Sequence, residues 1–360
     1  MRQLLTVGLF AFGVVLLRAE EEPKEPWTGE VRVYYIAADE IAWNYAPNGN
    51  VLAEMECCGD DTPWLTRGAD GKPPIFKKAI FREYTDDTFT QLKPRPPAWE
   101  HAGILGPILR AEVGDRIEVT VKNNTHFPVS FHSHGVHYLK PYEGAGYPDG
   151  TRRSDKADDA IAPGDAYTYR WGVPTRSGPG PNDPSSVVWL YHSHVNSPKD
   201  VNTGLIGALI VTRHGAARAD GSPADVDREF ITLFMNFDEP ESRLAKENAA
   251  LLNPSPAGNT NRFHSINGFV FGNLPMMRMK NGEHVRWYLV ALGGEHDLHT
   301  PHWHGNTVLH EGRRTDVIEL LPASMKVADM RADNPGIWLF HCHVGEHVKA
   351  GMAGRYEIEK

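Results

Sequence analysis

Histidine pairs separated by one residue are the feature of this 360-residue sequence with the clearest chemical meaning. Four such pairs occur, at His132–His134, His192–His194, His302–His304 and His341–His343. Alternate residues of a β-strand point to the same face, about 6.6 Å apart. Each pair can therefore present two imidazoles to one side of a strand and bind one metal ion or two neighbouring ions. An ordinary half-exposed strand explains one such pair more easily than four at repeated positions.

The central residue of the last pair is Cys342, whose side chain is expected to point away from its two histidine neighbours. His347 and Met352 follow it closely, and His299 precedes the third histidine pair by three residues. Two imidazoles, one thiolate and a weak axial methionine form a blue-copper electron-transfer site. A structural zinc site would need more thiolates or a Cys-x-x-Cys pair, which the sequence lacks. The pattern therefore favours copper.

Short strands must position these side chains. The segments Asp115–Val121 and His284–Leu289 alternate apolar and polar residues, as half-buried strands do. No long amphipathic helix is evident, although residues 239–252 could form a short one. With 34 Gly and 27 Pro to punctuate the strands, the sequence predicts an all-β protein built of β-sandwich domains.

The two halves of the sequence repeat one another. Gly114 and Gly282 each precede an alternating strand, a His-x-His-Gly segment follows in both halves, and an apolar-led His-x-His segment closes each. Between the halves lies a small, polar stretch with Gly and Pro. We predict a first domain at 25–213, a linker at 214–227 and a second domain at 228–360.

The segments HTPHWHG (299–305) and HCHVGEHVKAGM (341–352) resemble the multicopper oxidases, which include laccases and ferroxidases. From about Val31 to Tyr356 the chain is similar to paired domains of the ceruloplasmin group, with typical phrases at 81–86 and 106–109. The resemblance implies two cupredoxin-type Greek-key β-sandwich domains. It also implies an oxidoreductase that takes single electrons from a reducing substrate and reduces O₂ to water.

The same resemblance implies four copper ions per subunit, because every ligand position is filled. The type 1 ligands would be His299, Cys342, His347 and Met352, and the type 2 ligands His132 and His302. The type 3 ligands would be His134, His192, His194, His304, His341 and His343. Electrons would pass from Cys342 into His341 or His343.

The first domain departs from this pattern at three positions. Ser193, Val129 and Leu205 stand where the second domain has Cys342, His299 and Met352. The first domain is therefore expected to hold no type 1 copper. A non-enzymatic relative, such as an electron carrier or a coagulation-factor A domain, would not keep all the other ligands. A copper nitrite reductase would carry its type 1 site in the first domain.

The electron donor is less clearly marked. In ferroxidases of the ceruloplasmin group, acidic residues and one histidine near the type 1 copper receive Fe²⁺, and the matching residues are Glu295, Glu346 and His264. Asn259 stands where a further carboxylate is expected. This loss predicts a more neutral substrate site, so the sequence favours a laccase-like oxidase of phenolic or other aromatic donors. Ferroxidase activity is the alternative, and oxidation of Cu⁺ is a third choice.

Residues 1–19 contain an apolar run from Leu4 to Leu17 that ends near Ala19 and resembles a signal peptide. They predict a secreted or periplasmic protein. The formal net charge of −9 argues against a nucleic-acid partner. Cys57 and Cys58 are adjacent and cannot easily bridge one another, and no role is assigned to them.

Two further expectations follow from the resemblance. Two-domain relatives form a head-to-tail homotrimer in which each copper cluster lies between neighbouring subunits, an arrangement that heterologous contacts can close. Asp158 and Asp159 lie in a stretch similar to a calcium-binding loop of the ceruloplasmin group, which predicts a calcium ion there.

Overall fold

The computed structural model describes residues 29–55, 63–66, 68, 71–252 and 261–360. The predicted signal peptide, Cys57, Cys58 and Asn259 lie outside these residues. Within the described ranges, no helix has the length and apolar character needed to cross a membrane.

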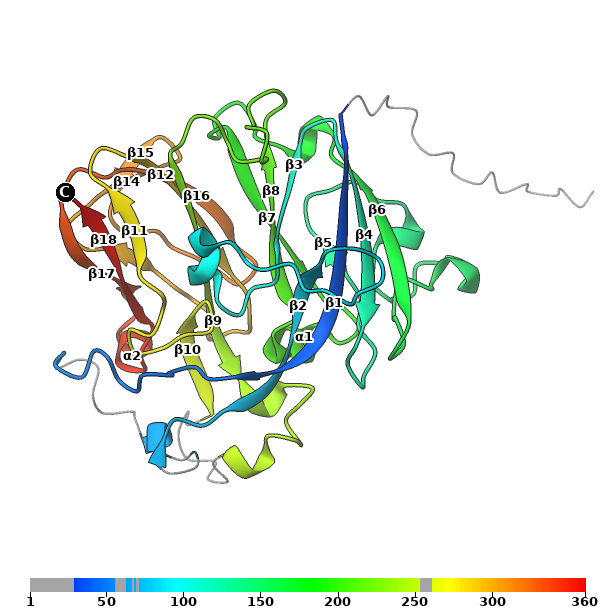
Figure 1. Ribbon diagram of the computed structural model, residues 1–360, viewed down its shortest axis with the longest axis horizontal. Helices are drawn as coiled ribbons and strands as arrows, with labels where there is room; N and C mark the ends of the chain where they lie inside the picture. Colours follow the sequence, from blue (N-terminus) through cyan, green and yellow to red (C-terminus); the bar gives the residue numbers. More distant parts are fainter. Residues whose placement is uncertain (1–28, 56–62, 67, 69–70, 253–260) are drawn as a thin grey trace, which may run out of the picture.

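The first half of the chain forms two four-stranded sheets (Figure 1). Phe81, Val119, Tyr169, Tyr191 and Leu209 are fully buried in the core between them. The first sheet has the order β2 (Phe76–Tyr84), β1 (Val31–Trp43), β4 (Arg116–Asn123) and β6 (Ala166–Gly172). The second has the order β3 (Ile108–Glu112), β8 (Ile206–Thr212), β7 (Ser186–His192) and β5 (His132–Ser133).

The second half forms a six-stranded sheet and a four-stranded sheet (Figure 1). Trp287, Trp303 and Phe340 fill the core between these two sheets. The larger sheet has the order β10 (Arg262–Ile266), β9 (Arg228–Asp238), β12 (His284–Ala291), β16 (Met325–Arg331), β14 (Val308–His310) and β15 (Arg313–Thr315). The smaller has the order β11 (Met277–Lys280), β18 (Ala353–Glu359), β17 (Gly336–Cys342) and β13 (Pro301–Trp303).

The two halves have the same strand pairing, which confirms the all-β fold expected from the sequence. β1 pairs with β4 in parallel as β9 pairs with β12, and β3 pairs with β8 in parallel as β11 pairs with β18. Parallel neighbours that are distant in sequence require crossover connections, as in Greek-key sandwiches. The strands expected at 115–121 and 284–289 are β4 and β12.

The helical elements are short. They are α1 (Ser197–Thr203), α2 (Gly345–Lys349) and the 3₁₀ turns η1 (Pro63–Thr66), η3 (Pro97–Ala102), η4 (Lys140–Tyr142), η5 (Arg153–Asp155), η6 (Thr175–Ser177), η7 (Glu239–Glu241) and η8 (Ala249–Leu251). The short helix expected at 239–252 is replaced by η7, η8 and the turns between them. Side chains compete with helical bonds there: the Ser242 hydroxyl accepts the Leu244 N–H, and Asn248 bonds to the backbone of Lys77.

A third core joins the two halves, with Phe76 and Ile210 from the first and Phe263 and Tyr288 from the second. The segment after β1 also crosses to the second half, where the Val51 N–H donates to the Phe271 carbonyl. We propose 214–227 as the domain boundary, because this segment lies between the last strand of the first two sheets, which ends at Thr212, and the first strand of the other two, which begins at Arg228.

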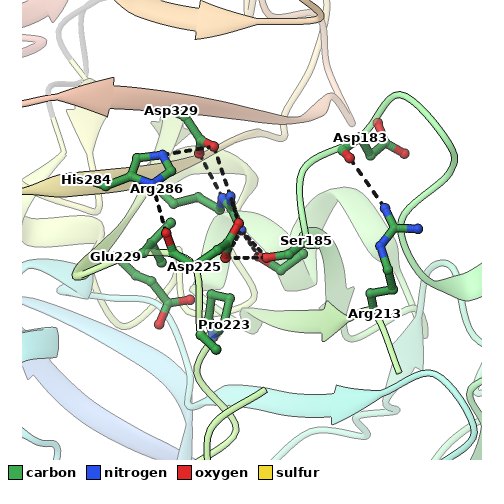
Figure 2. Close-up of polar contacts among 12 residues, drawn as sticks. Asp183, Ser185, Arg213, Pro223, Asp225, Glu229, His284, Arg286 and Asp329 are labelled. Atoms are coloured by element: carbon green, nitrogen blue, oxygen red, sulfur yellow. Dashed lines mark hydrogen bonds and ion pairs between the residues drawn. The ribbon is translucent and has the colours of Figure 1, made fainter. Parts of the chain in front are cut away.

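A buried ion-pair cluster fixes the linker against both halves (Figure 2). Arg286 on β12 is fully buried and donates two hydrogen bonds to Asp329 on β16, at 2.8 and 2.9 Å. It also donates to the linker carboxylate of Asp225 at 3.0 Å and to Ser185 of the first half at 2.7 Å. Burial alone would lower the pKa of Arg286, but the hydrogen bonds and charges of the carboxylates raise it above its ordinary value.

Replacing Arg286 with methionine is expected to destabilise the protein by about 3–5 kcal/mol, because two carboxylates would lose their buried partner. The loss should appear as a lower midpoint in denaturant unfolding. The matched control is Arg278→Met, because Arg278 forms an ion pair with Glu357 but is 57% exposed. A loss in Arg286→Met no larger than in this control would contradict the structural role given to the cluster.

Candidate metal centres

Cys342, His299 and His347 form a buried cluster in the second half of the chain. Cys342 ends β17, His347 lies on α2 directly after it, and His299 precedes β13, which pairs with β17. The sulfur lies 4.0 Å from Nδ1 of His299 and 3.6 Å from Nδ1 of His347, and the two nitrogens are 3.2 Å apart. Three of the four predicted type 1 ligands are thus brought together.

Met352, the fourth, is fully buried in the same hydrophobic core as Cys342. Two backbone hydrogen bonds fix its place: the Cys342 N–H donates to the Met352 carbonyl at 3.0 Å, and the Met352 N–H donates to the His347 carbonyl at 2.9 Å.

This cluster favours a thiolate. Burial alone would raise the pKa of the Cys342 thiol, but hydrogen bonds with His299 and His347 lower it to about 6. Asp297 supports the arrangement from behind, since its carboxylate lies 3.1 Å from Nε2 of His299 and is itself buried. A carboxylate on the far nitrogen fixes the ring so that Nδ1 faces the sulfur. The sequence analysis missed Asp297, although its position two residues before His299 was a usable signal.

Four histidines gather beside this cluster, on or directly after the edge strand β13 and its neighbour β17. His302 pairs directly with His341 across the two strands. Nε2 of His341 lies 3.3 Å from Nδ1 of His302 and 3.1 Å from Nε2 of His304. The His343 ring centroid lies 5.2 Å from that of His302. We call these residues the second tetrad: His302, His304, His341 and His343.

The first half of the chain has an equivalent group, which we call the first tetrad: His132, His134, His192 and His194. Its residues lie on or shortly after the edge strand β5 and its neighbour β7, where His132 pairs with His192. Nε2 of His134 lies 3.2 Å from Nε2 of His192, and the neighbouring rings have centroids 5.2–5.6 Å apart.

Both tetrads contain neutral imidazoles whose orientation is fixed by the backbone. Nδ1 of His192 donates to the Ser193 carbonyl at 3.0 Å, and Nδ1 of His341 donates to the Cys342 carbonyl at 2.8 Å. Their Nε2 atoms therefore face the other rings. Burial lowers the pKa of His192 to about 3 and that of His341 to about 4. Neutral, oriented imidazoles are the form that binds metal ions.

The two tetrads lie on different sheets. In the described part of the chain, no hydrogen bond or ring contact joins a histidine of the first tetrad to one of the second. Each half of the chain thus presents its own group of four imidazoles.

The first half has the same backbone hydrogen bonds as the cysteine cluster but different side chains at the matching positions. The Ser193 N–H donates to the Leu205 carbonyl, and the Leu205 N–H donates to that of Asp200. These bonds match those of Cys342, Met352 and His347, so Asp200 takes the place of His347. The Ser193 hydroxyl donates to Asp200 at 2.7 Å, and Arg243 forms an ion pair with the same buried carboxylate at 2.6 Å.

Of the predicted substrate residues, His264 on β10 packs against the cysteine cluster. Its ring centroid is 4.8 Å from that of His347, and its Nδ1 is buried without a hydrogen-bond partner among the residues that the structure describes. Burial lowers the pKa of His264 to about 3. Glu346 is exposed and precedes His347 on α2. Glu295 is 89% exposed and lies against His296.

Comparison with known proteins points to one protein family. A family model described as multicopper oxidase matches residues 98–215, and a second with the same description matches 244–360. The chain is 43% identical to human Ferroxidase HEPHL1 over 341 residues, which is 91% of this chain and 29% of the relative. It is 40% identical to rat ceruloplasmin over 92% of this chain and 32% of the relative.

Human coagulation factor V is 41% identical over 90% of this chain and 14% of its own length. The chain therefore spans a third or less of the length of these curated relatives. Among solved structures, Multicopper Oxidase mgLAC is 22% identical with a TM-score of 0.61, covering 92% of this chain and 86% of the other, which supports the fold.

The two family matches together cover more than half of the chain, and the sheets have the arrangement of the solved relatives. This chain belongs to the multicopper oxidases, a family of copper-dependent oxidoreductases built from cupredoxin domains.

Proposed function

We propose that this protein is a ferroxidase, which oxidises Fe²⁺ one electron at a time and couples this to the reduction of O₂ to water. The observation that carries the proposal is the buried, unpartnered Nδ1 of His264 beside His347, with the Glu346 carboxylate on the adjoining helix. An imidazole and a carboxylate suit a divalent cation better than a phenol. The relatives named ferroxidase and ceruloplasmin favour the same choice.

This proposal reverses the preference of the sequence analysis, which gave more weight to the missing carboxylate at Asn259. Asn259 lies outside the described residues, so the geometry that supports iron rests on His264 and Glu346.

The donor set fits copper. We propose that His299, Cys342, His347 and Met352 hold the type 1 ion, because a buried thiolate, two imidazoles and a thioether suit copper better than zinc. The two tetrads would hold the type 2 and type 3 ions through their facing ring nitrogens. Copper bound at these sites supplies the one-electron oxidation of the substrate and the four-electron reduction of O₂.

The residues around the sites have separate tasks. Cys342 is joined through the backbone to His341 and His343, so it provides the shortest covalent route between the cysteine cluster and the second tetrad. Asp297 holds the proton on Nε2 of His299 and leaves Nδ1 free to bind. Phe234 shields the cysteine cluster from water, because its buried ring lies 5.9 Å from that of His299 and packs against Phe340 in the same core.

Fe²⁺ specificity tests the proposal. Replacing His264 with alanine is expected to lower kcat/KM for Fe²⁺ by about tenfold or more, as loss of groups that support a metal site does, with kcat/KM for a simple phenol unchanged. The matched control is His126→Ala, because His126 is more than half exposed and lies against Glu40 in the first half of the chain, so kcat/KM for both donors should stay unchanged.

Blue absorbance should stay the same in both variants, which would show that His347 is undisturbed. An equal loss for Fe²⁺ and phenol in His264→Ala, or a wild type that prefers phenol, would contradict the ferroxidase proposal.

We also propose a homotrimer in which the first tetrad of one subunit faces the second tetrad of the next. The separation of the tetrads on different sheets supports this arrangement, because one chain presents two incomplete halves of the cluster. Head-to-tail contacts of this kind close into rings. The segment at 1–19 supports export, as a secreted or periplasmic protein.

A calcium site at Asp158 and Asp159 is a further part of the proposal. Asp158 is fully buried, its Oδ2 accepts the Gly144 N–H at 2.7 Å, and its Oδ1 has no hydrogen-bond partner in the described part of the chain. Burial raises the pKa of the Asp158 carboxyl to about 6. A buried oxygen without a partner, beside a second carboxylate, suits a hard cation such as Ca²⁺.

Millimolar CaCl₂ is therefore expected to raise the thermal unfolding temperature, with a stabilisation of about 2.7 kcal/mol when calcium reaches 100 times its Kd. Asp158→Asn should remove this calcium effect, whereas Asp155→Asn on the same loop should keep it. An equal calcium effect in wild type and Asp158→Asn would count against the site.

A further inference from the structure

A cavity of about 840 Å³ lies away from the metal centres, between strands β1, β2 and β3 and the linker. Seven of its lining residues are Lys or Arg and four are Asp or Glu. The chain as a whole has the opposite balance, with a formal net charge of −9. Five of the seven cations form ion pairs with carboxylates, so the positive charge that can attract an anion into this hollow is that of the remaining two.

Among the described residues, Arg95 and Arg218 are the two cations of this cavity that form no ion pair with a carboxylate. Arg95 donates to the backbone carbonyls of Gly103, at 2.7 Å, and Leu105. Arg218 donates to the carbonyls of Pro223 at 2.6 Å and Val226 at 2.8 Å. These bonds hold both groups at the cavity wall, but a neutral carbonyl does not cancel a positive charge. Asp220, whose pKa is lowered by hydrogen bonds from Ser222 and by the charges of Arg110 and Arg218, offsets part of the Arg218 charge.

Other cations of the cavity, unlike Arg95 and Arg218, form ion pairs with carboxylates. Arg110 forms an ion pair with Glu229 at 2.6 Å, and Lys93 forms one with Glu83 at 2.8 Å. Loss of hydration acts to lower the pKa of Arg95 and that of Arg110. For Arg110 the interaction with Glu229 outweighs this effect, so its pKa lies above its ordinary value. No carboxylate does this for Arg95, and its pKa stays below its ordinary value.

The cavity also has an apolar side, formed by Trp99, Tyr34 and Leu92. The Trp99 ring lies 5.4 Å from the Arg110 guanidinium and is partly exposed. A volume of this size accommodates an organic molecule rather than a bare ion. The apolar side would contact its carbon skeleton while the guanidinium groups bind its charges.

We propose that this cavity binds a small organic anion with two or more carboxylate or phosphate groups, which Arg95 and Arg218 recognise. Bound ligand would also stabilise the domain arrangement. The wall residue Glu229 accepts a hydrogen bond from Tyr288 at 2.8 Å, and Tyr288 contacts Ser186, a partner of the buried Arg286. Figure 2 shows Glu229 beside this ion-pair cluster.

The experiment uses the copper-loaded full chain and two probes, tricarballylate as a tricarboxylate and adenosine monophosphate as an organic phosphate. Isothermal titration calorimetry should give saturable binding at one site per chain for at least one probe. The unfolding temperature should rise with that probe more than with KCl at equal ionic strength. Binding of tricarballylate alone would identify the site as one for carboxylates, and binding of adenosine monophosphate alone as one for phosphates.

Arg95→Gln and Arg218→Gln should each raise the Kd about tenfold or more, the usual effect of losing a hydrogen bond between charged groups. Arg213→Gln is the matched control, because Arg213 also donates to carbonyls, those of Gly180 and Asp183, but does not line the cavity. Figure 2 shows this arginine apart from the cluster.

Absence of binding of both probes to the wild type would overturn the proposal without any variant. An equal loss of affinity in Arg213→Gln would overturn it as well, since the effect would then be one of general surface charge. Neither outcome depends on ferroxidase activity.

Discussion

Replacing Cys342 with serine is expected to remove the blue absorbance of the copper-loaded protein and to reduce O₂ consumption with any donor to background. The change exchanges a thiol whose pKa is about 6 for a hydroxyl that does not ionise near neutral pH. It removes both a soft copper ligand and the covalent route to His341 and His343. Copper analysis should show the loss of the proposed type 1 ion alone, because the second tetrad uses only imidazoles.

The fold should tolerate this replacement. Ser193 occupies the same position in the first half of the chain, and its N–H donates to the Leu205 carbonyl at 3.1 Å as the Cys342 N–H donates to that of Met352 at 3.0 Å. Ser193→Ala is the matched control and should keep both colour and turnover. Thermal unfolding would show whether both variants are folded. Turnover that survives in Cys342→Ser would contradict the proposed electron route.

Much of the site follows from local patterns in the sequence. The strand period places alternate residues on one face, so the histidines of each pair gather while the residues between them turn away. The structure agrees: Ser133, Trp303 and Cys342 are fully buried in the cores. The repeat of strand and histidine pair in the two halves also fixed the fold class, because each half had to form the same sandwich.

Contacts between segments that are distant in sequence could not be predicted from such local patterns. β1 and β4 are parallel neighbours although the residues they pair, such as Val31 and Arg116, are far apart in the chain. The ion pair between Asp200 and Arg243 also joins segments that are distant in sequence, because it connects the first half to the loop after β9. No periodic pattern marks such partners, and Asp200 was therefore missed.

The linker shows what composition alone cannot predict. Its small, polar composition predicts a linker, and the segment lies between the last strand of the first two sheets and the first strand of the other two. Composition does not indicate that Asp225 within it is a partner of the fully buried Arg286. The partners of that guanidinium come from the linker and from both halves, so only the assembled fold brings them together.

The arrangement of the tetrads leads to the second prediction with a large effect, which concerns mixed assemblies. His192→Ala removes one imidazole of the first tetrad and should abolish O₂ reduction while keeping the blue absorbance. Cys342→Ser leaves the first tetrad intact. If each cluster forms between the first half of one subunit and the second half of the next, co-expression of the two inactive variants should restore activity.

The size of the restored activity can be estimated. In a randomly mixed ring, an intact cluster needs a first half from a Cys342→Ser chain and a second half from a His192→Ala chain. Each condition holds for half of the subunits, so about a quarter of the wild-type activity is expected. A cluster formed within one chain would give none, because every chain carries one damaged half.

Two measurements make the result specific. A chain with both substitutions, co-expressed with either single variant, should remain inactive, since one kind of intact half is then missing from every assembly. Sedimentation equilibrium should give the mass of three chains, because a closed dimer would also allow complementation. Full inactivity of the mixed assemblies, with folded subunits and normal copper in the intact halves, would place the cluster within a single chain. The separation of the two tetrads within the chain favours the opposite outcome, because His192 and His341 then need a neighbouring subunit to complete the set of eight imidazoles.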